Sequence, residues 1–167
     1  MKIFPLTEGY LEFVRKVRNN SLINKYLFTD ANISKEDQEK WYRRFLKDKS
    51  HLVFIAFDNV PVGYGQIKNI DYLKNSCELG FCITPEHQGK GYGKILIKKL
   101  IGYVFRELDL NYIYLEVFTD NIKAIELYKK CGFVEEKILD KRILKNSDIK
   151  NILVMSLMRK GKINDKD

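Results

Sequence analysis

A glycine-rich segment over residues 84–94, Thr-Pro-Glu-His-Gln-Gly-Lys-Gly-Tyr-Gly-Lys, holds the residue types best suited to bind an anion. Its three glycines lie within five positions, so they permit positive φ angles and let a ligand approach the backbone closely. A predicted strand ends before this segment and a predicted helix begins within it, which gathers N–H groups at a helix N-terminus. The natural ligand is a phosphate or a diphosphate. The spacing matches neither the Walker loop nor the dinucleotide-binding fingerprint.

Hydrophobic periodicity predicts the elements that position this segment. Residues 51–57 form an apolar strand, and residues 61–67 return as the second strand of a hairpin. The strand over residues 76–84 ends at Pro85 and alternates between its two faces. From residue 91 to about residue 108, apolar residues recur at helical spacing.

The rest of the chain completes a sheet of mixed direction. A strand over residues 112–118 precedes a helix over 121–130, which Asp120 would cap and Gly132 would end. One strand–helix–strand unit among antiparallel strands predicts an α+β protein, with six to seven strands and about four helices. The other predicted elements are a first strand, a helix over about residues 8–19, a helix opened by a Ser34–Asp37 capping box, and strands over 133–143 and 150–158.

Composition narrows the class of protein. We expect one domain over residues 1–158 and a polar tail over 159–167, in a chain long enough to bury a core without disulfides or metals. No apolar run approaches the roughly 18 residues of a membrane span, and no signal peptide is recognisable before Glu8. The three cysteines are an odd number without metal-like spacing, which predicts reduced thiols, no metal site and a cytoplasmic protein.

The net charge of +8 is compatible with an anionic partner, although a lysine-rich surface explains it equally well. The sequence has no basic stripe with interleaved aromatic residues and no recognition-helix signature. We therefore expect no nucleic-acid partner.

Two segments together resemble the GNAT acyltransferases. Residues 88–93, Gln-Gly-Lys-Gly-Tyr-Gly, match the family signature of Gln or Arg, any two residues, Gly, any residue, then Gly or Ala. About thirty residues later, residues 121–133 match Asn-x-x-Ala-x-x-x-Tyr-x-x-x-Gly-Phe. The resemblance implies the GNAT-like acyl-CoA N-acyltransferase fold, with acetyl-CoA as co-substrate and no metal. CoA carries about four negative charges, which accounts for a basic surface without nucleic acid.

The resemblance also implies a cofactor site. The strand before Pro85 would diverge from the next parallel strand, and the backbone groups of Cys82 and Ile83 would pair with pantetheine in the gap. Asn121 would contact the pantetheine arm. Lys90 and Lys94 would meet phosphate charge, although a solvated helix face explains them equally well. The diphosphate would lie on the backbone amides of Gln88, Gly89, Lys90, Gly91, Tyr92 and Gly93.

Three residues are candidates for proton transfer. Acyl transfer needs a neutral amine, and CoA leaves as a thiolate that benefits from a proton donor. Tyr128 shares a helix face with Asn121 and resembles the family tyrosine beside the CoA sulfur; otherwise it is a half-buried packing residue. Glu116 precedes Tyr128 by 12 positions, which resembles the base–acid pair of ribosomal-protein acetyltransferases. Glu78 resembles an acidic residue of polyamine and aminosugar acetyltransferases. Each glutamate is otherwise an ion-paired carboxylate on a solvated face.

The family resemblance places the acceptor cleft beside residues 19–33 and 140–150. The stretch over residues 17–42 looks like the branch that acts on ribosomal-protein N-termini, polyamines and nucleotide-linked aminosugars. Residues 15–30 hold four basic residues against Asp30, a balance that disfavours a polycation. We therefore expect an aminosugar nucleotide or a protein N-terminal amine as the acceptor. A polyamine acceptor and a non-catalytic acyl-CoA-binding protein are the alternatives. We expect a monomer or a homodimer.

Overall fold

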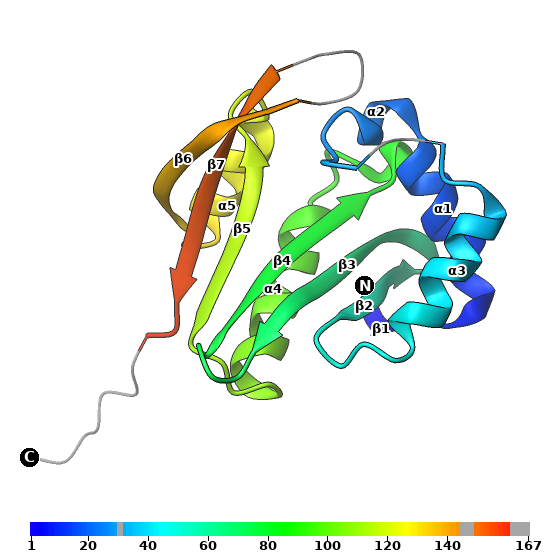
Figure 1. The fold of residues 1–167 in the computed structure, drawn as a ribbon, viewed down its shortest axis with the longest axis horizontal. Coiled ribbons are helices and arrows are strands. Elements are labelled where there is room, and N and C mark those ends of the chain that lie inside the picture. Colours follow the sequence, from blue (N-terminus) through cyan, green and yellow to red (C-terminus); the bar gives the residue numbers. More distant parts are fainter. Residues whose placement is uncertain (30–31, 144–148, 161–167) are drawn as a thin grey trace, which may run out of the picture.

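A seven-stranded mixed sheet runs through the computed structural model, which describes residues 1–29, 32–143 and 149–160 (Figure 1). The strand order is β1-β2-β3-β4-β5-β7-β6. β4 and β5 pair in parallel, and the other neighbouring strands pair antiparallel. The strands are β1 (Lys2–Pro5), β2 (Leu52–Asp58), β3 (Val60–Asp71), β4 (Ser76–Ile83), β5 (Tyr112–Phe118), β6 (Val134–Ile143) and β7 (Ile149–Met158).

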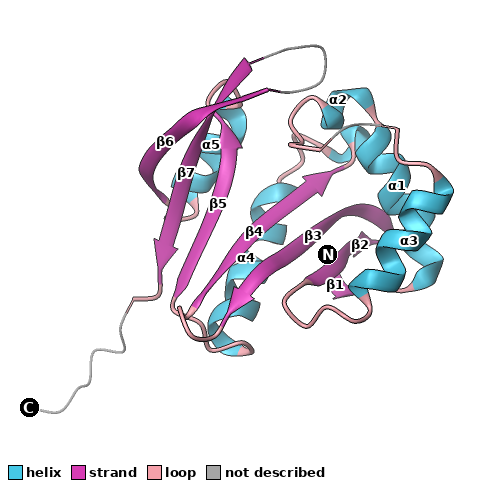
Figure 2. Cartoon of the chain, viewed as in Figure 1, coloured by secondary structure: helices cyan, strands magenta, loops and turns pink. Residues whose placement is uncertain are grey.

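Helices cover both faces of the sheet, but not to the same extent. α1, α2 and α3 lie on one face beside the first four strands, whereas α4 and α5 pack on the other face (Figure 2). The first face of β5, β7 and β6 therefore carries no described helix. The helices are α1 (Leu11–Asn19), α2 (Ser21–Asn24), α3 (Lys35–Phe45), α4 (Tyr92–Arg106) and α5 (Ile122–Lys130), with 3-10 turns at Glu8–Tyr10 and Pro85–His87.

Strand alternation sorts the apolar side chains into two cores. On β4, Cys77, Leu79 and Ile83 join the larger core under α4 and α5, whereas Cys82 joins the smaller core under α1. This confirms the prediction that side chains of this strand alternate between two faces, because a single strand can supply both cores only if alternate side chains point to opposite faces.

Local sequence signals predicted several boundaries correctly. β5 covers residues 112–118 as expected, and the capping box forms, with the Ser34 hydroxyl 3.0 Å from the Asp37 N–H that donates to it. Gly132 follows the end of α5 at φ +96°, where a glycine avoids the strain of a side chain.

Two features depart from the sequence expectations. Asp120 does not cap α5; Asn121 occupies the cap position, and the Asp120 carboxylate instead accepts a hydrogen bond from Lys150 at 3.0 Å. α2 was not expected, because four residues are too few to show a helical period. Asn20 starts this short helix by accepting a hydrogen bond from the Leu22 N–H at 3.0 Å. Much of the 140–150 connection and residues 161–167 of the tail lie outside the described residues.

Gln38 on α3 offers a test of how the smaller helical layer is stabilised. Its side chain is 2% exposed, and neither amide atom has a hydrogen-bond partner among the described residues. A buried polar group without a partner destabilises the folded state. Gln38→Met removes both polar atoms with little change in volume, so the free energy of unfolding should rise by about 1 kcal/mol. Thermal denaturation would show a melting temperature roughly 2–4 °C higher.

Gln66 provides the matched control, because its amide oxygen lies 3.2 Å from His51 Nε2. Gln66→Met should lower stability. A loss of stability in Gln38→Met as large as that in Gln66→Met would contradict the assignment of Gln38 as an unsatisfied group.

Candidate active site

The parallel strands β4 and β5 separate part-way along their length. Their pairing covers only Ser76–Tyr112, Cys77–Ile113 and Glu78–Tyr114. Each strand continues beyond that point with its outer partner, because β3 follows β4 to Ile83 and β7 follows β5 to Phe118. The inner edges therefore diverge and leave backbone groups without a strand partner among the described residues. A ligand with amide groups in an extended chain can pair with such an edge as an added strand.

The direction of the backbone identifies which residues of β4 face this gap. The Thr84 N–H donates to Val62 on β3 at 3.0 Å, so Thr84 points away from the gap. Alternation turns Cys82 the same way, and an added Cβ on Gly63 of β3 would collide with the Cys82 carbonyl. Phe81 and Ile83 therefore face the gap. The sequence expectation is wrong for Cys82 at this point, and Phe81 takes its place.

The Gln88 side chain ties the glycine-rich loop to β4. Its Nε2 donates to the Ile83 carbonyl at 3.0 Å. This bond leaves the Ile83 N–H, together with the Phe81 N–H and C=O, for a ligand in the gap. Resemblance to the family motif assigned the backbone of Gln88 to the diphosphate, and the role of its side chain was not foreseen.

The three glycines of the loop have two different functions. Gly89 and Gly91 adopt φ angles of +75° and +82°, and a Cβ on either would meet nothing within 4 Å. Both thus border open space. Gly91 caps α4 without a side-chain hydrogen bond, so the first amides of the helix remain available to an anion. Gly93 differs, because a Cβ there would lie 3.2 Å from Leu127 and 3.4 Å from Phe81. Gly93 is therefore required for packing.

The remaining loop residues surround this helix start. The Tyr92 hydroxyl donates to Asp58 at 2.7 Å, so its phenol fixes α4 to the β2–β3 turn and points away from the loop amides. Lys90 and Lys94 are exposed, which suits either a phosphate contact or a solvated surface. Asn121 begins α5 just after β5, and its side chain does not cap that helix.

Tyr128 on α5 reaches the gap from the face of the larger core. It is 9% exposed, and its ring lies 6.0 Å from the Phe81 ring in an edge-to-face contact. Burial raises the pKa of Tyr128, and the neighbouring Cys82 raises it further. The contact with Phe81, whose backbone groups face the gap, places the Tyr128 ring beside the gap. Tyr128 is therefore protonated at neutral pH and can act as a donor.

Cys82 is not a nucleophile in this site. Burial raises the pKa of its thiol to about 11, and the Sγ donates to the Tyr64 hydroxyl at 3.6 Å. A thiol that stays protonated at neutral pH attacks carbonyls poorly. This agrees with the interpretation of Cys82 as a small strand residue.

The two candidate bases differ in their surroundings. Glu78 is 7% exposed; its Oε1 lies 2.6 Å from Lys68 Nζ, and its Oε2 accepts from Asn69 at 2.8 Å. Both oxygens thus already have cationic or amide partners. Glu116 lies two residues beyond Tyr114, the last β5 residue paired with β4. Burial raises the pKa of Tyr114. Asn69 Nδ2 donates to Glu78 Oε2 at 2.8 Å and to the Tyr114 hydroxyl at 3.4 Å, and strand alternation places Glu116 on the same face as Tyr114.

Glu116 also borders a shallow pocket of about 210 Å³ on the face of β5, β7 and β6 that has no described helix. The pocket adjoins the level at which β4 and β5 separate. The residues that line it are Tyr112, Tyr114, Glu116, Glu136, Lys137, Leu139 and Val154.

Comparison with known proteins identifies the family. Residues 18–133 match the model of the acetyltransferase (GNAT) family. The chain belongs to this family. A spermidine N(1)-acetyltransferase of Vibrio cholerae is 33% identical over 161 residues, which cover 95% of this chain and 93% of that protein. The acetyltransferase PseH of Campylobacter jejuni is 32% identical over 148 residues, which cover 87% and 92%.

Solved structures agree with this assignment. The Vibrio cholerae spermidine N-acetyltransferase, crystallised with CoA and spermine, superposes with a TM-score of 0.89 at 32% identity over 94% of both chains. The GNAT fold and the use of acetyl-CoA expected from the sequence are therefore confirmed. This GNAT protein is an N-acetyltransferase. The described helices include none long and apolar enough to cross a membrane.

The described residues fit acetyl-CoA. The diverging strands leave an unpaired edge for the two amides of pantetheine, and the uncapped start of α4 suits the diphosphate. Sequence reasoning missed Phe81 and Glu136. Alternation along β4 identifies Phe81 as a residue that faces the gap only when the pairing of β4 with β3 is known. Glu136 belongs to no recognised sequence motif.

Gly91→Val tests the diphosphate site. A branched side chain at a positive φ distorts the loop and points into the open space beside its amides. Acetyl-CoA should bind about thirtyfold more weakly, equivalent to about 2 kcal/mol, as measured by calorimetry on the folded variant. Gly132→Val is the matched control, because Gly132 also has a positive φ but follows α5. It should lose stability and keep its affinity. Wild-type affinity in folded Gly91→Val would exclude this loop as the diphosphate site.

Proposed function

We propose that this acetyltransferase transfers the acetyl group of acetyl-CoA directly to a primary amine of a linear polyamine such as spermidine. The main support for a polyamine acceptor is the pocket beside the β4–β5 gap, which both Glu116 and Glu136 line. The two carboxylates and the Lys137 ammonium leave a formal charge of about −1 in its lining. Similarity to spermidine acetyltransferases supports the same class. A cytoplasmic location is part of the proposal, since polyamines and acetyl-CoA must meet there.

The lining of the pocket suits alkylammonium groups. Glu136 lies at a bulge in β6, where the register with β7 shifts between Glu135 and Lys137. The Tyr112 hydroxyl donates to Glu136 Oε1 at 2.7 Å, which holds the carboxylate over the open face. The rings of Tyr112 and Tyr114, 6.3 Å apart, add aromatic surface of the kind that attracts cations. Bulges commonly redirect side chains near active sites.

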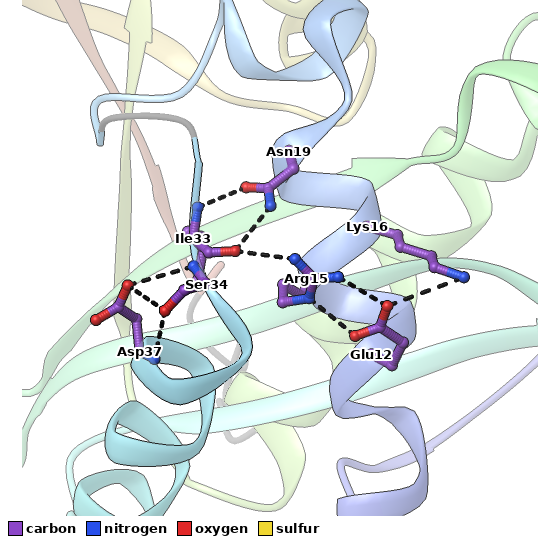
Figure 3. Close-up of polar contacts among 7 residues, drawn as sticks. All are labelled: Glu12, Arg15, Lys16, Asn19, Ile33, Ser34 and Asp37. Carbon is purple, nitrogen blue, oxygen red and sulfur yellow. Dashed lines mark hydrogen bonds and ion pairs between the residues drawn. The ribbon is translucent and has the colours of Figure 1, made fainter.

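The sequence argument against polyamines fails for a structural reason. It counted the basic residues near α1 as a positive field around the acceptor. In the structure, Arg15 and Lys16 pair with Glu12 on the same helix, at 2.8 and 3.9 Å. Glu12 offsets one of these two positive charges locally (Figure 3), so the charge count, which left Glu12 out, overstated the field at the site.

The geometry supports direct transfer with the proton donor and the proton acceptor on opposite faces of the sheet beside the gap. The amine nitrogen attacks the acetyl carbonyl carbon, the carbon–sulfur bond breaks, and the amide forms. Glu116 takes the ammonium proton, directly or through water, the attacking nitrogen releases its second proton to solvent as the amide forms, and Tyr128 supplies a proton to the departing thiolate. Solvent then reprotonates Tyr128. N–H groups of Phe81 and Ile83 are available to polarise the thioester carbonyl.

The base matters because an alkylammonium has a pKa of about 10.4, so neutralising it at pH 7 costs about 4–5 kcal/mol. Glu116 is preferred over Glu78 as this base, because Glu116 lines the pocket beside the β4–β5 gap and Glu78 does not.

An aminosugar nucleotide is the second candidate acceptor, and Arg18 favours it. The Arg18 guanidinium donates to the Thr29 hydroxyl at 2.8 Å and lowers the pKa of the Cys82 thiol, against the larger effect of burial. A cation beside residues 19–33, where the family resemblance places the acceptor cleft, suits an acceptor that carries phosphate. No described contact favours a protein N-terminal amine, which stays a prediction from the sequence.

An acceptor panel separates these candidates. With acetyl-CoA and spermidine, short diamines, aminosugar nucleotides and peptides, spermidine should show a kcat/KM at least about tenfold above every other class. Glu136→Gln should lower kcat/KM for spermidine at least about fivefold. Glu135→Gln is the matched control, because Glu135 pairs with Lys129 at 2.7 Å and lies outside the pocket lining. An aminosugar nucleotide as best substrate, with its rate reduced by Arg18→Met, would replace the polyamine proposal.

Tyr128→Phe and Glu116→Gln test the proton transfers. Tyr128→Phe keeps the ring but removes the donor, so kcat should fall at least tenfold at unchanged affinity for acetyl-CoA, within the usual 10²–10⁴-fold range of such catalysis. Because burial raises the pKa of Tyr128, the donor stays protonated and the wild-type rate should show no loss of this acid below about pH 10. The deficit of Glu116→Gln should shrink at high pH, where the amine is already neutral.

Glu78→Gln serves as the comparison for Glu116→Gln. Activity retained in Glu116→Gln but lost in Glu78→Gln would move the base to Glu78. Full activity of Tyr128→Phe would leave that tyrosine a packing residue.

A further inference from the structure

Two flexible glycines separate the points at which the glycine-rich loop is held. At its start, the Gln88 side chain donates to the Ile83 carbonyl on β4. Gly89 and Gly91 follow, both with left-handed φ angles and with open space beside them. Glycine loses more backbone freedom on ordering than any other residue, so such a loop keeps one shape only if both of its ends are fixed. The second end is Tyr92, the first residue of α4.

The Tyr92 phenol joins this second end to two other parts of the molecule. Its hydroxyl donates to Asp58 Oδ2 at 2.7 Å, a length typical of a bond to a charged oxygen. Its ring lies 5.9 Å from the His87 ring in an edge-to-face contact. His87 belongs to the 3-10 turn just before the loop, where its Nδ1 lies 2.7 Å from Thr84 Oγ1. Tyr92 therefore connects the end of the loop to its beginning and to the β2–β3 hairpin.

Asp58 is well placed to hold the phenol still. It ends β2 and pairs with Val60 across a tight turn, in which Asn59 adopts a φ of +62°. Its other oxygen, Oδ1, lies 3.2 Å from the Met1 ammonium. The hydrogen bond from Tyr92 lowers the pKa of Asp58, and this ammonium lowers it further, so the carboxylate is charged at neutral pH. The hairpin thus presents a fixed, charged acceptor to the first residue of α4.

We propose that Asp58 is a positioning residue for acetyl-CoA, acting through its hydrogen bond to Tyr92. The bond fixes the first residue of α4, and with it the N–H groups that the uncapped helix start offers to the diphosphate. A loop that is ordered before the ligand arrives loses less entropy on binding, which raises affinity. The inference goes beyond the proposed function, since it holds for any amine acceptor. It rests on the glycine-rich loop as the diphosphate site, which Gly91→Val tests separately.

Tyr92→Phe removes the hydroxyl, keeps the ring and is the principal test. The Kd for acetyl-CoA, measured by calorimetry without an amine, should rise about fivefold. The kcat at saturating acetyl-CoA should stay within about twofold of wild type, because bound CoA then orders the loop. Tyr112→Phe is the matched control, since it removes a tyrosine–carboxylate bond of the same 2.7 Å length, to Glu136. It should leave the Kd for acetyl-CoA within about twofold of wild type.

Changes at Asp58 test whether Tyr92 acts through it. Asp58→Ala should raise the Kd about as much as Tyr92→Phe, and the double variant should raise it no further, because each change deletes the same bond. Asp58→Asn keeps an acceptor oxygen and should restore part of the affinity. Asp71→Ala is the matched control, because Asp71 ends β3 and accepts from the N–H groups of Leu73 and Lys74 in the next turn. It should lower the melting temperature and leave the Kd within about twofold.

Hydrogen exchange follows the start of α4 directly. Without ligand, the amides of residues 95–98 should exchange faster in Tyr92→Phe than in wild type, because the Ile95 N–H makes the first bond of the helix, to the Gly91 carbonyl at 3.2 Å. Saturating CoA should remove the difference.

A Kd within about twofold of wild type in folded Tyr92→Phe would overturn the proposal. So would an equal further loss of affinity when Tyr92→Phe is added to Asp58→Ala. If wild type acetylates no amine of the panel, the proposed function fails, whereas the Kd measurements still decide the role of Asp58.

Discussion

The early end of pairing between β4 and β5 is the constraint on which the rest of the site depends. Both strands keep their outer partners past Glu78 and Tyr114, so neither can turn inward to close the gap. Backbone polar groups that face such a gap must find another partner, because an unpaired buried N–H or C=O is costly. The fold therefore favours a ligand that behaves like a strand. Tyr128 and Glu116 lie on opposite faces of the sheet. Side chains on opposite faces can reach the same ligand only where the strands between them have separated.

The two substrates are recognised by different kinds of structure. The proposed CoA site consists of backbone groups of β4 and the amides at the start of α4, which many side-chain combinations can present. The proposed acceptor site consists of side chains, chiefly the carboxylates of Glu116 and Glu136 in the open-face pocket. Short sequence motifs reflect the local backbone geometry that a ligand needs, but they do not reveal side-chain contacts from residues far apart in the sequence. The CoA segments are therefore recognisable in the sequence, whereas the acceptor is not.

Sequence reasoning succeeded where the deciding contacts are local. The capping box at Ser34 and the glycine after α5 depend on residues within four positions, and β5 has a clear apolar pattern bounded by polar residues. It failed where partners are distant. Asp120 can cap a helix or pair with Lys150, and only the packing of β7 decides between them. Alternation showed that Cys82 and Phe81 face opposite ways, but the pairing with β3 was needed to tell which of them faces the gap.

The buried thiol of Cys82 has a consequence for the chemical resilience of the enzyme. Oxidants and alkylating agents react with thiolates, and a pKa of about 11 leaves almost none at neutral pH. Burial raises the pKa of Cys77 to about 12 and also raises that of Cys131. A cysteine on a strand that borders the gap would ordinarily be a point of oxidative damage. Here desolvation keeps the thiol protonated, so Cys82 should react slowly with such reagents at neutral pH.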